Sequence, residues 1–288
     1  MSLTNSRKYP VLPPDEAIRA LFARLDDLCG AAARGETAMT AFLSPREAKY
    51  ARLYLSHRLT EGLAVLWGGY PDAERVRAIL LPDYCEGLVD PAALSADPAA
   101  ALAEAGLDDL SDSLTAAVTP LRVTGSGYRT LSHRDYLGSV MGAGLERDAL
   151  GDVLVQDEHS AVLICGSRMA EYLLSGLERI GADAVKVARL APGEAPQAVV
   201  RTQPLSDTVA SQRLDCVAAS LCNLSRDKAQ SAIRAGLCEL NYECVQDVDT
   251  AVEAPAVLSV RGFGKFRVLS FDGETRKGRI RMRAEKYI

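Results

Sequence analysis

Basic and amide side chains recur every four residues in one stretch near the C-terminus of this chain. Arg226, Gln230 and Arg234 share this spacing, which places them in one row along an α-helix. The planar guanidinium of arginine matches phosphate oxygens, and a glutamine amide can reach a 2′-hydroxyl or a base edge. The row therefore predicts contact with an RNA backbone, although such a row is also typical of the solvated face of a packed helix.

A second pattern of basic residues alternates with apolar ones. The alternating residues are Lys265 and Arg267 on either side of Phe266, and Arg279, Arg281 and Arg283 around Ile280 and Met282. A period of two places the charges on one face of a β-strand and the apolar residues on the other. The pattern predicts a basic track for phosphates, or else an edge strand that its charges keep soluble.

Further side chains could complete this surface. The additional candidates are Arg213, Ser225, Lys228, Asn241 and Tyr242, with Lys228 peripheral to the row that starts at Arg226. Asp215 is expected to be structural, because a carboxylate repels phosphate. His133 and Arg134 predict a second RNA surface, at the start of a helix whose N–H groups favour phosphate.

Motifs for catalysis and for metal binding are absent from the sequence. There is no Walker loop, no Gly-x-Ser-x-Gly elbow and no His-Glu-x-x-His pair. His133-Arg134-Asp135 resembles a kinase catalytic loop, but no glycine-rich loop or Asp-Phe-Gly motif accompanies it. The seven cysteines form no Cys-x-x-Cys pair and favour buried thiols. We expect no catalytic residue, no metal and no cofactor.

Charge is distributed unevenly along the chain. The 288 residues carry a net charge of −5, yet residues 201–288 hold 14 basic and 11 acidic residues, a net of +3. A local positive field matters more for RNA than the overall sum. The apolar runs fall far short of the roughly 20 residues that cross a membrane, and Met1–Pro14 lacks the apolar core of a signal peptide. We expect a cytoplasmic protein that is monomeric when free.

Two segments precede the basic C-terminal part. Residues 1–62 predict a helical region, with helices over Asp15–Arg34 and from the cap Ser44 to about Leu59. Residues 63–190 predict an α/β sandwich like an RNA-recognition motif (RRM-like), in which Asp90–Asp112 is a weakly helical insertion or a loop. Its strands are expected at Leu63–Trp67, Arg77–Leu81, Pro120–Thr124, Asp152–Gln156, Ala161–Cys165 and Ala184–Ala188, and its helices at Ser132–Met141 and Ser167–Ile180.

The last segment should carry the candidate residues. Residues 191–204 are rich in proline and predict a linker. Residues 205–288 predict a small module of two helices, capped by Ser211 and Ser225, followed by hairpin strands. These strands are expected at Leu237–Leu240, Val257–Val260, Phe266–Ser270 and Gly278–Ala284. The fold class is therefore predicted to be α+β.

Several motifs in register resemble a known family. Arg213-Leu214-Asp215, Ser225-Arg226, Ala229, Ile233, Gly236 and Asn241 resemble the RNA-binding module named after ribosomal small-subunit protein four. Residues 258–266, with Gly68-Gly69-Tyr70, Leu81–Tyr84, His133–Gly138, Met141-Gly142 and Gly151–Val155, resemble bacterial YlmH-type proteins from about Leu63 to the end. Two positions depart from the module. Asn241-Tyr242 replaces its Asn-Gly turn, which predicts a wider turn or a Tyr242 that stacks on a base, and Pro255-Ala256 replaces its Gly-Asp.

The resemblance implies a non-catalytic RNA-binding protein. It further implies binding of rRNA and tRNA on the large ribosomal subunit during the rescue of stalled translation, and more loosely a link to cell division. Two alternatives remain open. One is an RNA-modifying or tRNA-charging enzyme with an accessory module, and the other is a protein-binding adaptor.

Overall fold

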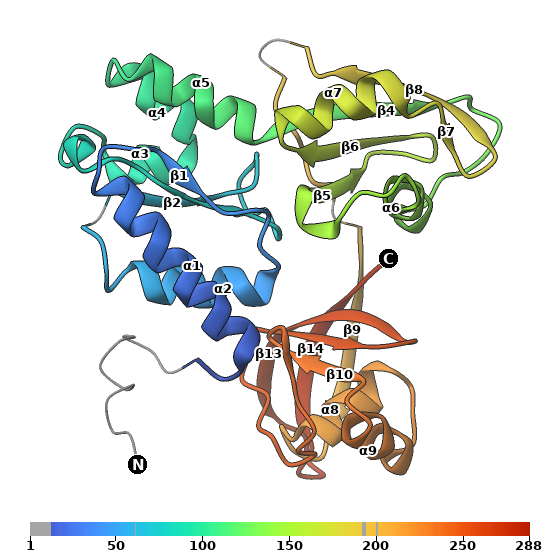
Figure 1. Cartoon of the computed structure of the whole chain (residues 1–288). Helices are drawn as coiled ribbons and strands as arrows, with labels where there is room; N and C mark the ends of the chain where they lie inside the picture. The colour runs from blue at the N-terminus through green and yellow to red at the C-terminus, as the bar shows by residue number, and fades with distance from the viewer. Residues whose placement is uncertain (1–12, 61, 192–193, 200) are drawn as a thin grey trace. The chain divides into compact units, whose positions relative to one another are not determined.

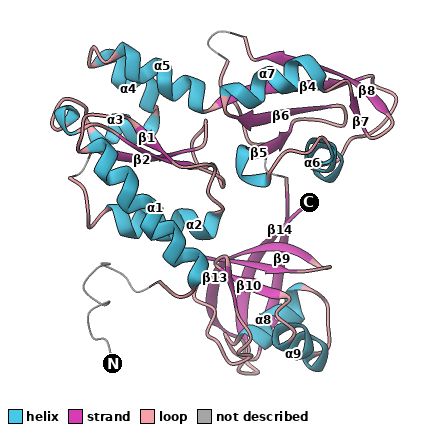
Figure 2. Cartoon of the chain, viewed as in Figure 1, coloured by secondary structure: helices cyan, strands magenta, loops and turns pink. Residues whose placement is uncertain are grey.

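The computed structural model describes residues 13–60, 62–191, 194–199 and 201–288 (Figure 1). The chain divides into two compact units, residues 1–199 and 200–288. Both units combine helices with strands (Figure 2), so the predicted α+β class is confirmed.

The first unit begins with two helices close to their predicted starts, and α2 begins at its predicted cap. Asp15 accepts a hydrogen bond from the N–H of Ile18 at 3.0 Å and begins α1 (Glu16–Ala32). Ser44 begins α2 (Pro45–Leu55) and forms a reciprocal capping box with Glu47. The apolar faces of the two helices share one core, which confirms the predicted pair.

A three-stranded antiparallel sheet lies against these helices. Its order is β1 (Ala38–Met39), β3 (Arg77–Leu80) and β2 (Ala64–Trp67). The sequence predicts β2 and β3 as the start of a domain at residue 63, but both strands pair in a sheet with β1. Ala78 and Leu80 of β3 also lie in the core formed by α1 and α2. A boundary at residue 62 would divide this core, so the pairing favours a boundary further along the chain.

Three short helices cover the other face of this small sheet. They are α3 (Pro91–Ala96), α4 (Pro98–Glu104) and α5 (Asp108–Ala117). Asp90 and Asp97 cap the first two, and a proline follows each cap at the first helical position. Leu94 and Leu102 pack with Ile79 on that face, because successive residues of a strand point to opposite sides. The segment predicted as a weakly helical insertion or loop is thus a packed helical layer.

The middle of the chain forms an RRM-like layer. Its five antiparallel strands follow the order β5 (Leu150–Val155), β6 (Ser160–Cys165), β4 (Thr119–Gly125), β8 (Asp183–Arg189) and β7 (Arg179–Ile180). The helices α6 (His133–Gly142) and α7 (Ser167–Gly176) pack on one face of the sheet. The connectivity is the split β-α-β arrangement. The predicted helix over Ser167–Ile180 ends earlier, because Arg179 and Ile180 form β7.

The second unit is a six-stranded sheet with two helices. Its antiparallel strands follow the order β11 (Glu243–Cys244), β10 (Cys238–Leu240), β12 (Ala256–Val260), β13 (Gly264–Glu274), β14 (Ile280–Tyr287) and β9 (Thr202–Val209). The helices α8 (Leu214–Leu221) and α9 (Arg226–Arg234) pack against one face, around Phe266 and Val268. The predicted pair of helices and the following strands are confirmed, and Ser225 caps α9 as predicted. The predicted cap at Ser211 is wrong, because α8 begins after Arg213 and no side chain caps it.

β9 changes the predicted limits of this unit. The sequence predicts residues 191–204 as a linker, but Thr202, Gln203 and Pro204 pair with β14. The pairing supplies β14 with a second neighbour, so its backbone is hydrogen-bonded on both sides. Residues 192, 193 and 200 of the predicted linker, and residues 1–12, lie outside the described residues. Along the part of the chain that the structure describes, no helix is long and apolar enough to cross a membrane.

Candidate RNA-binding surface

A buried carboxylate organises the basic residues at the start of α8 and α9. The side chain of Asp215 is 0% exposed. Arg213 donates to it from Nε at 3.2 Å and from Nη2 at 3.1 Å, and Arg226 donates from Nε at 3.0 Å. Gln230 completes the set, with its amide nitrogen 2.7 Å from Oδ2. Asp215 is therefore structural, as predicted, and it ties together three of the candidate residues.

The hydrogen bonds decide the protonation state of Asp215. Burial by itself would raise the pKa of this carboxyl group, but the donors Arg213, Gln230 and Arg226 hold the pKa well below its usual range. The carboxylate therefore stays charged and fixes both guanidinium groups. Arg213 also forms an ion pair with Asp249. The side chain of Arg226 remains 53% exposed, so its outer nitrogens face solvent.

The row on α9 forms as predicted, but its three side chains differ in exposure. Arg226 and Arg234 are exposed at the two ends of the helix, whereas Gln230 is half-buried against Asp215. Ser225 is the N-cap, and its hydroxyl accepts a hydrogen bond from the N–H of Lys228 at 3.4 Å. Ser225 thus begins the helix, and the exposed charges of the row are the two arginines.

The strands β13 and β14 carry the second set of candidates on the face away from the helices. Met282 and Ala284 are buried, and the alternating Arg281 and Arg283 are exposed, which confirms the predicted period. Arg283 pairs with Asp272 at 2.6 Å. The remaining basic residues differ in whether they have partners. Arg279 donates from Nε to the hydroxyl of Thr208 at 2.9 Å, while Arg267 and Arg281 have no ion pair among the described residues.

The turn between β10 and β11 is tight. Asn241 and Tyr242 have φ values of 50° and 66°, so two left-handed residues link strands that pair from Leu240 to Glu243. The departure from Asn-Gly therefore does not widen the turn. Tyr242 packs beside Lys265, whose ammonium lies 5.3 Å from its ring centroid and 5.1 Å from that of Tyr287.

His133 and Arg134 occupy the first turn of α6 in the other unit. Ser132 and Asp135 form a capping box there, and the Asp135 carboxylate accepts from the Ser132 N–H at 2.8 Å. Desolvation and the charge of Arg147 lower the pKa of His133, which keeps the ring neutral near pH 7. The Asp135 carboxylate already lies at this helix N-terminus, so the site is less favourable for phosphate than predicted. Arg134 is an exposed cation there.

The candidates therefore form two sets in the second unit. One surrounds Asp215 on the helical side, and the other follows the outer face of the sheet. Tyr287 belongs with Lys265 and was missed, although its spacing from Arg281 and Arg283 predicts the same face of β14.

Among the described residues no cluster of His, Cys, Asp and Glu could hold a metal ion. All seven cysteines are free, and burial raises the pKa of Cys238 to about 11 and that of Cys165 to about 12.

Comparison with known proteins places the chain in a family. A model described as "YlmH, N-terminal" matches residues 17–85, and one described as "Putative RNA-binding domain in YlmH" matches residues 123–193. The chain is 32% identical over 248 residues to "Ribosome-associated protein quality control protein P2" of Bacillus subtilis (strain 168), with 86% of each chain covered. It is also similar to the solved structure "Cell division protein ylmH from Streptococcus pneumoniae", at a TM-score of 0.46 and 18% identity, over 65% of this chain and 99% of that one.

The RRM-like layer and the matched RNA-binding domain define the class as an RNA-binding protein. The chain belongs to the YlmH family, as its motifs predicted. The N-terminal match ends at residue 85 and so includes β2 and β3 with the first two helices.

Proposed function

We propose that this protein binds structured RNA on the ribosome through its C-terminal unit and acts in translation quality control. The name of the Bacillus relative supports ribosome association and quality control. The partners we propose are rRNA of the large subunit and tRNA, in the cytoplasm and without a catalytic step. The observation that carries the proposal is the buried Asp215, which holds Arg213 and Arg226 in place.

Fixed arginines suit this role for a physical reason. A free arginine loses rotamer freedom when it binds phosphate, and that loss weakens binding. Arg226 is already held through Nε, so less freedom remains to be lost, and its exposed nitrogens can donate to phosphate. Arg234 extends the same row by two helical turns. Arg267 and Arg281 add positive charge on the sheet side.

The test is co-sedimentation with purified ribosomal subunits over a range of salt concentrations. Wild-type protein should bind the large subunit, and binding should weaken as salt rises, because RNA releases counterions on binding. Arg226→Ala/Arg234→Ala should weaken binding by about tenfold or more and lower the slope of log affinity against log salt by about 1 to 2.

A matched control removes two exposed arginines from α1, Arg19→Ala/Arg24→Ala, and changes the net charge equally. Its binding should equal that of wild type. Binding that is insensitive to salt, or equal loss in both double variants, would contradict the proposed contact. Absence of binding to ribosomal subunits and to tRNA would instead favour a protein-binding adaptor.

A further inference from the structure

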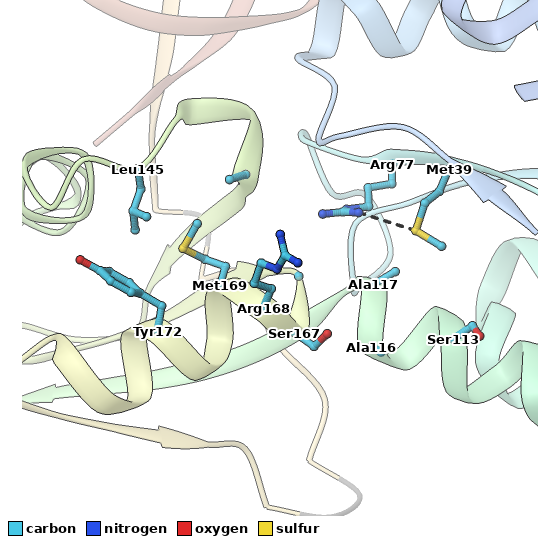
Figure 3. Close-up of a pocket in the computed structure, with 12 residues that line it drawn as sticks. Met39, Arg77, Ser113, Ala116, Ala117, Leu145, Ser167, Arg168, Met169 and Tyr172 are labelled. Atoms are coloured by element: carbon cyan, nitrogen blue, oxygen red, sulfur yellow. Dashed lines mark hydrogen bonds between the residues drawn. The ribbon is translucent and has the colours of Figure 1, made fainter. Parts of the chain in front are cut away.

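A cavity of about 670 Å³ opens in the first unit, lined by residues of β1, β3, α5 and α7 (Figure 3). Met39, Met169 and Tyr172 give it apolar walls. Arg77 of β3 and Arg168 of α7 extend their guanidinium groups toward the same space. The volume lies within the range of small-molecule sites.

Arg77 is a half-buried cation on the wall of this cavity. Its Nη1 contacts the sulfur of Met39 at 3.6 Å, and its guanidinium lies 4.6 Å from the ring centroid of Phe42. Its Nε is buried and has no hydrogen-bond partner, and no carboxylate pairs with it among the described residues. Burial lowers its pKa, although the charge of Asp148 acts in the opposite direction. A buried, unpaired charge is costly, and an anion in the cavity would remove that cost.

The start of α7 adds to the positive field at the same place. Gly166 is the N-cap and no side chain caps the helix, so the first N–H groups lack a side-chain acceptor. Nη2 of Arg77 lies directly over Gly166, 3.0 Å from where a Cβ would stand. A cation at the positive end of a helix is unfavourable. Arg168, at the second position of α7, has no ion pair in the described ranges. Two guanidinium groups and a helix N-terminus therefore converge, and no carboxylate among the described residues forms an ion pair with either guanidinium.

We propose that this cavity binds a nucleotide, with its phosphate between Arg77, Arg168 and the N-terminus of α7. The hydroxyls of Ser113 and Ser167, which also line the cavity, can donate to the phosphate or the sugar. The base lies against Met39, Met169 and Tyr172, because thioethers and aromatic rings pack well on flat rings. Tyr172 follows Arg168 by one turn of α7, so both side chains are on one face of the helix.

The experiment is equilibrium binding of the four nucleoside 5′-monophosphates to the full chain, with adenosine and inorganic phosphate as partial probes. At least one monophosphate should bind saturably at millimolar concentration. Its nucleoside and inorganic phosphate should each bind about tenfold more weakly or worse, since each lacks one half of the contacts. Arg168 and Tyr172 are both exposed. The substitutions Arg168→Ala and Tyr172→Ala should each weaken binding by about tenfold.

Arg24→Ala, an exposed arginine of α1, is the matched control and should bind like wild type. The proposal is overturned if no monophosphate binds, or if both cavity variants bind as tightly as wild type. Inorganic phosphate that binds as well as the monophosphate would overturn the role of the apolar walls. These outcomes are independent of ribosome binding, because every residue involved lies in the first unit.

A free nucleotide and the end of an RNA chain present the same chemistry. Competition with a short oligoribonucleotide that carries a 5′-phosphate, compared with its 5′-hydroxyl counterpart, separates the two sources. Displacement by the phosphorylated form alone assigns the cavity to an RNA end. Failure of both to displace the mononucleotide assigns it to a free nucleotide.

Discussion

The carboxylate of Asp215 is fully buried and receives hydrogen bonds from Arg213, Arg226 and Gln230. Burial of a charged carboxylate is costly unless hydrogen-bond donors compensate for the lost water. Those donors are among the residues that we propose to contact RNA. Stability and recognition therefore depend on the same contacts. On the sheet side, Arg279 and Arg283 are held by neighbours, whereas Arg267 and Arg281 have no ion pair in the part of the chain that the structure describes.

Asp215→Asn tests this dependence. The amide keeps the shape of the side chain but loses the charge and one acceptor, so we expect the second unit to lose about 1–3 kcal/mol of unfolding free energy. RNA affinity should fall as well, although Asp215 itself faces no RNA. Urea unfolding followed with a probe of the second unit measures the first effect, and co-sedimentation measures the second.

The pH dependence checks the cause. The folded-state pKa of Asp215 is below the ordinary value of 3.8, so the native state resists protonation. Its contribution is complete above pH 3.8 and is lost as pH falls below that value. The stability gap between wild type and Asp215→Asn should narrow below about pH 4. Asp227→Asn, exposed on α9, is the control. If the difference in unfolding free energy between wild type and Asp215→Asn does not change with pH, the lost stability comes from packing and not from the charge of Asp215.

The turn between β10 and β11 requires two residues with positive φ. Both Asn241 and Tyr242 adopt positive φ, where side chains other than those of Gly and Asn are strained. Asn241 tolerates this conformation, and its Oδ1 accepts a hydrogen bond from the Val257 N–H at 2.9 Å. The turn thus joins β11 and β12 to β10 in register, and it presents Tyr242 beside Lys265.

Asn241→Ala should destabilise the second unit by about 1–2 kcal/mol, because alanine loses the bond to Val257 and is strained at this φ. Asn241→Asp keeps the acceptor and the tolerance of positive φ, and should stay within about 0.5 kcal/mol of wild type. Thermal unfolding of both variants measures the difference. Equal stabilities for the two variants would show that neither the bond nor the backbone conformation matters there.

At the scale of the whole molecule, each unit contains its own core and its own candidate site. The core of the second unit draws only on residues 205–284, and the Asp215 cluster lies within it. The cavity with Arg77 and Arg168 lies wholly in the first unit. No core cluster of the described residues contains side chains from both units, so the two binding activities can be separated.

Residues 200–288 expressed alone should therefore fold cooperatively and keep RNA binding that depends on Asp215. The buried apolar side chains of this unit pack against one another, so removal of the first unit exposes none of the core described above. Circular dichroism during urea unfolding and filter binding at several salt concentrations are the measurements. A fragment without a cooperative transition would show that the second unit needs the first to fold.

The sequence alone determined the features that depend on neighbours along the chain. Ser44 marks a helix start, and the alternation around Met282 predicts a strand with one charged face, because capping and periodicity are local. The family motifs are likewise runs of adjacent residues. The predicted helix row at Arg226, Gln230 and Arg234 formed for the same reason.

Only the tertiary structure decided which distant groups meet. β9 pairs with β14, and β2 and β3 form a sheet with β1. Thr208 accepts a hydrogen bond from Arg279. No local sequence pattern encodes such partners. The same holds for Arg77 and Arg168, which converge from β3 and α7 on one cavity. A charge is recognisable in a sequence, but whether it is paired, buried or exposed depends on contacts between segments far apart in the chain. The sequence therefore predicted the candidate cations, and the fold decided which of them remain available to a ligand.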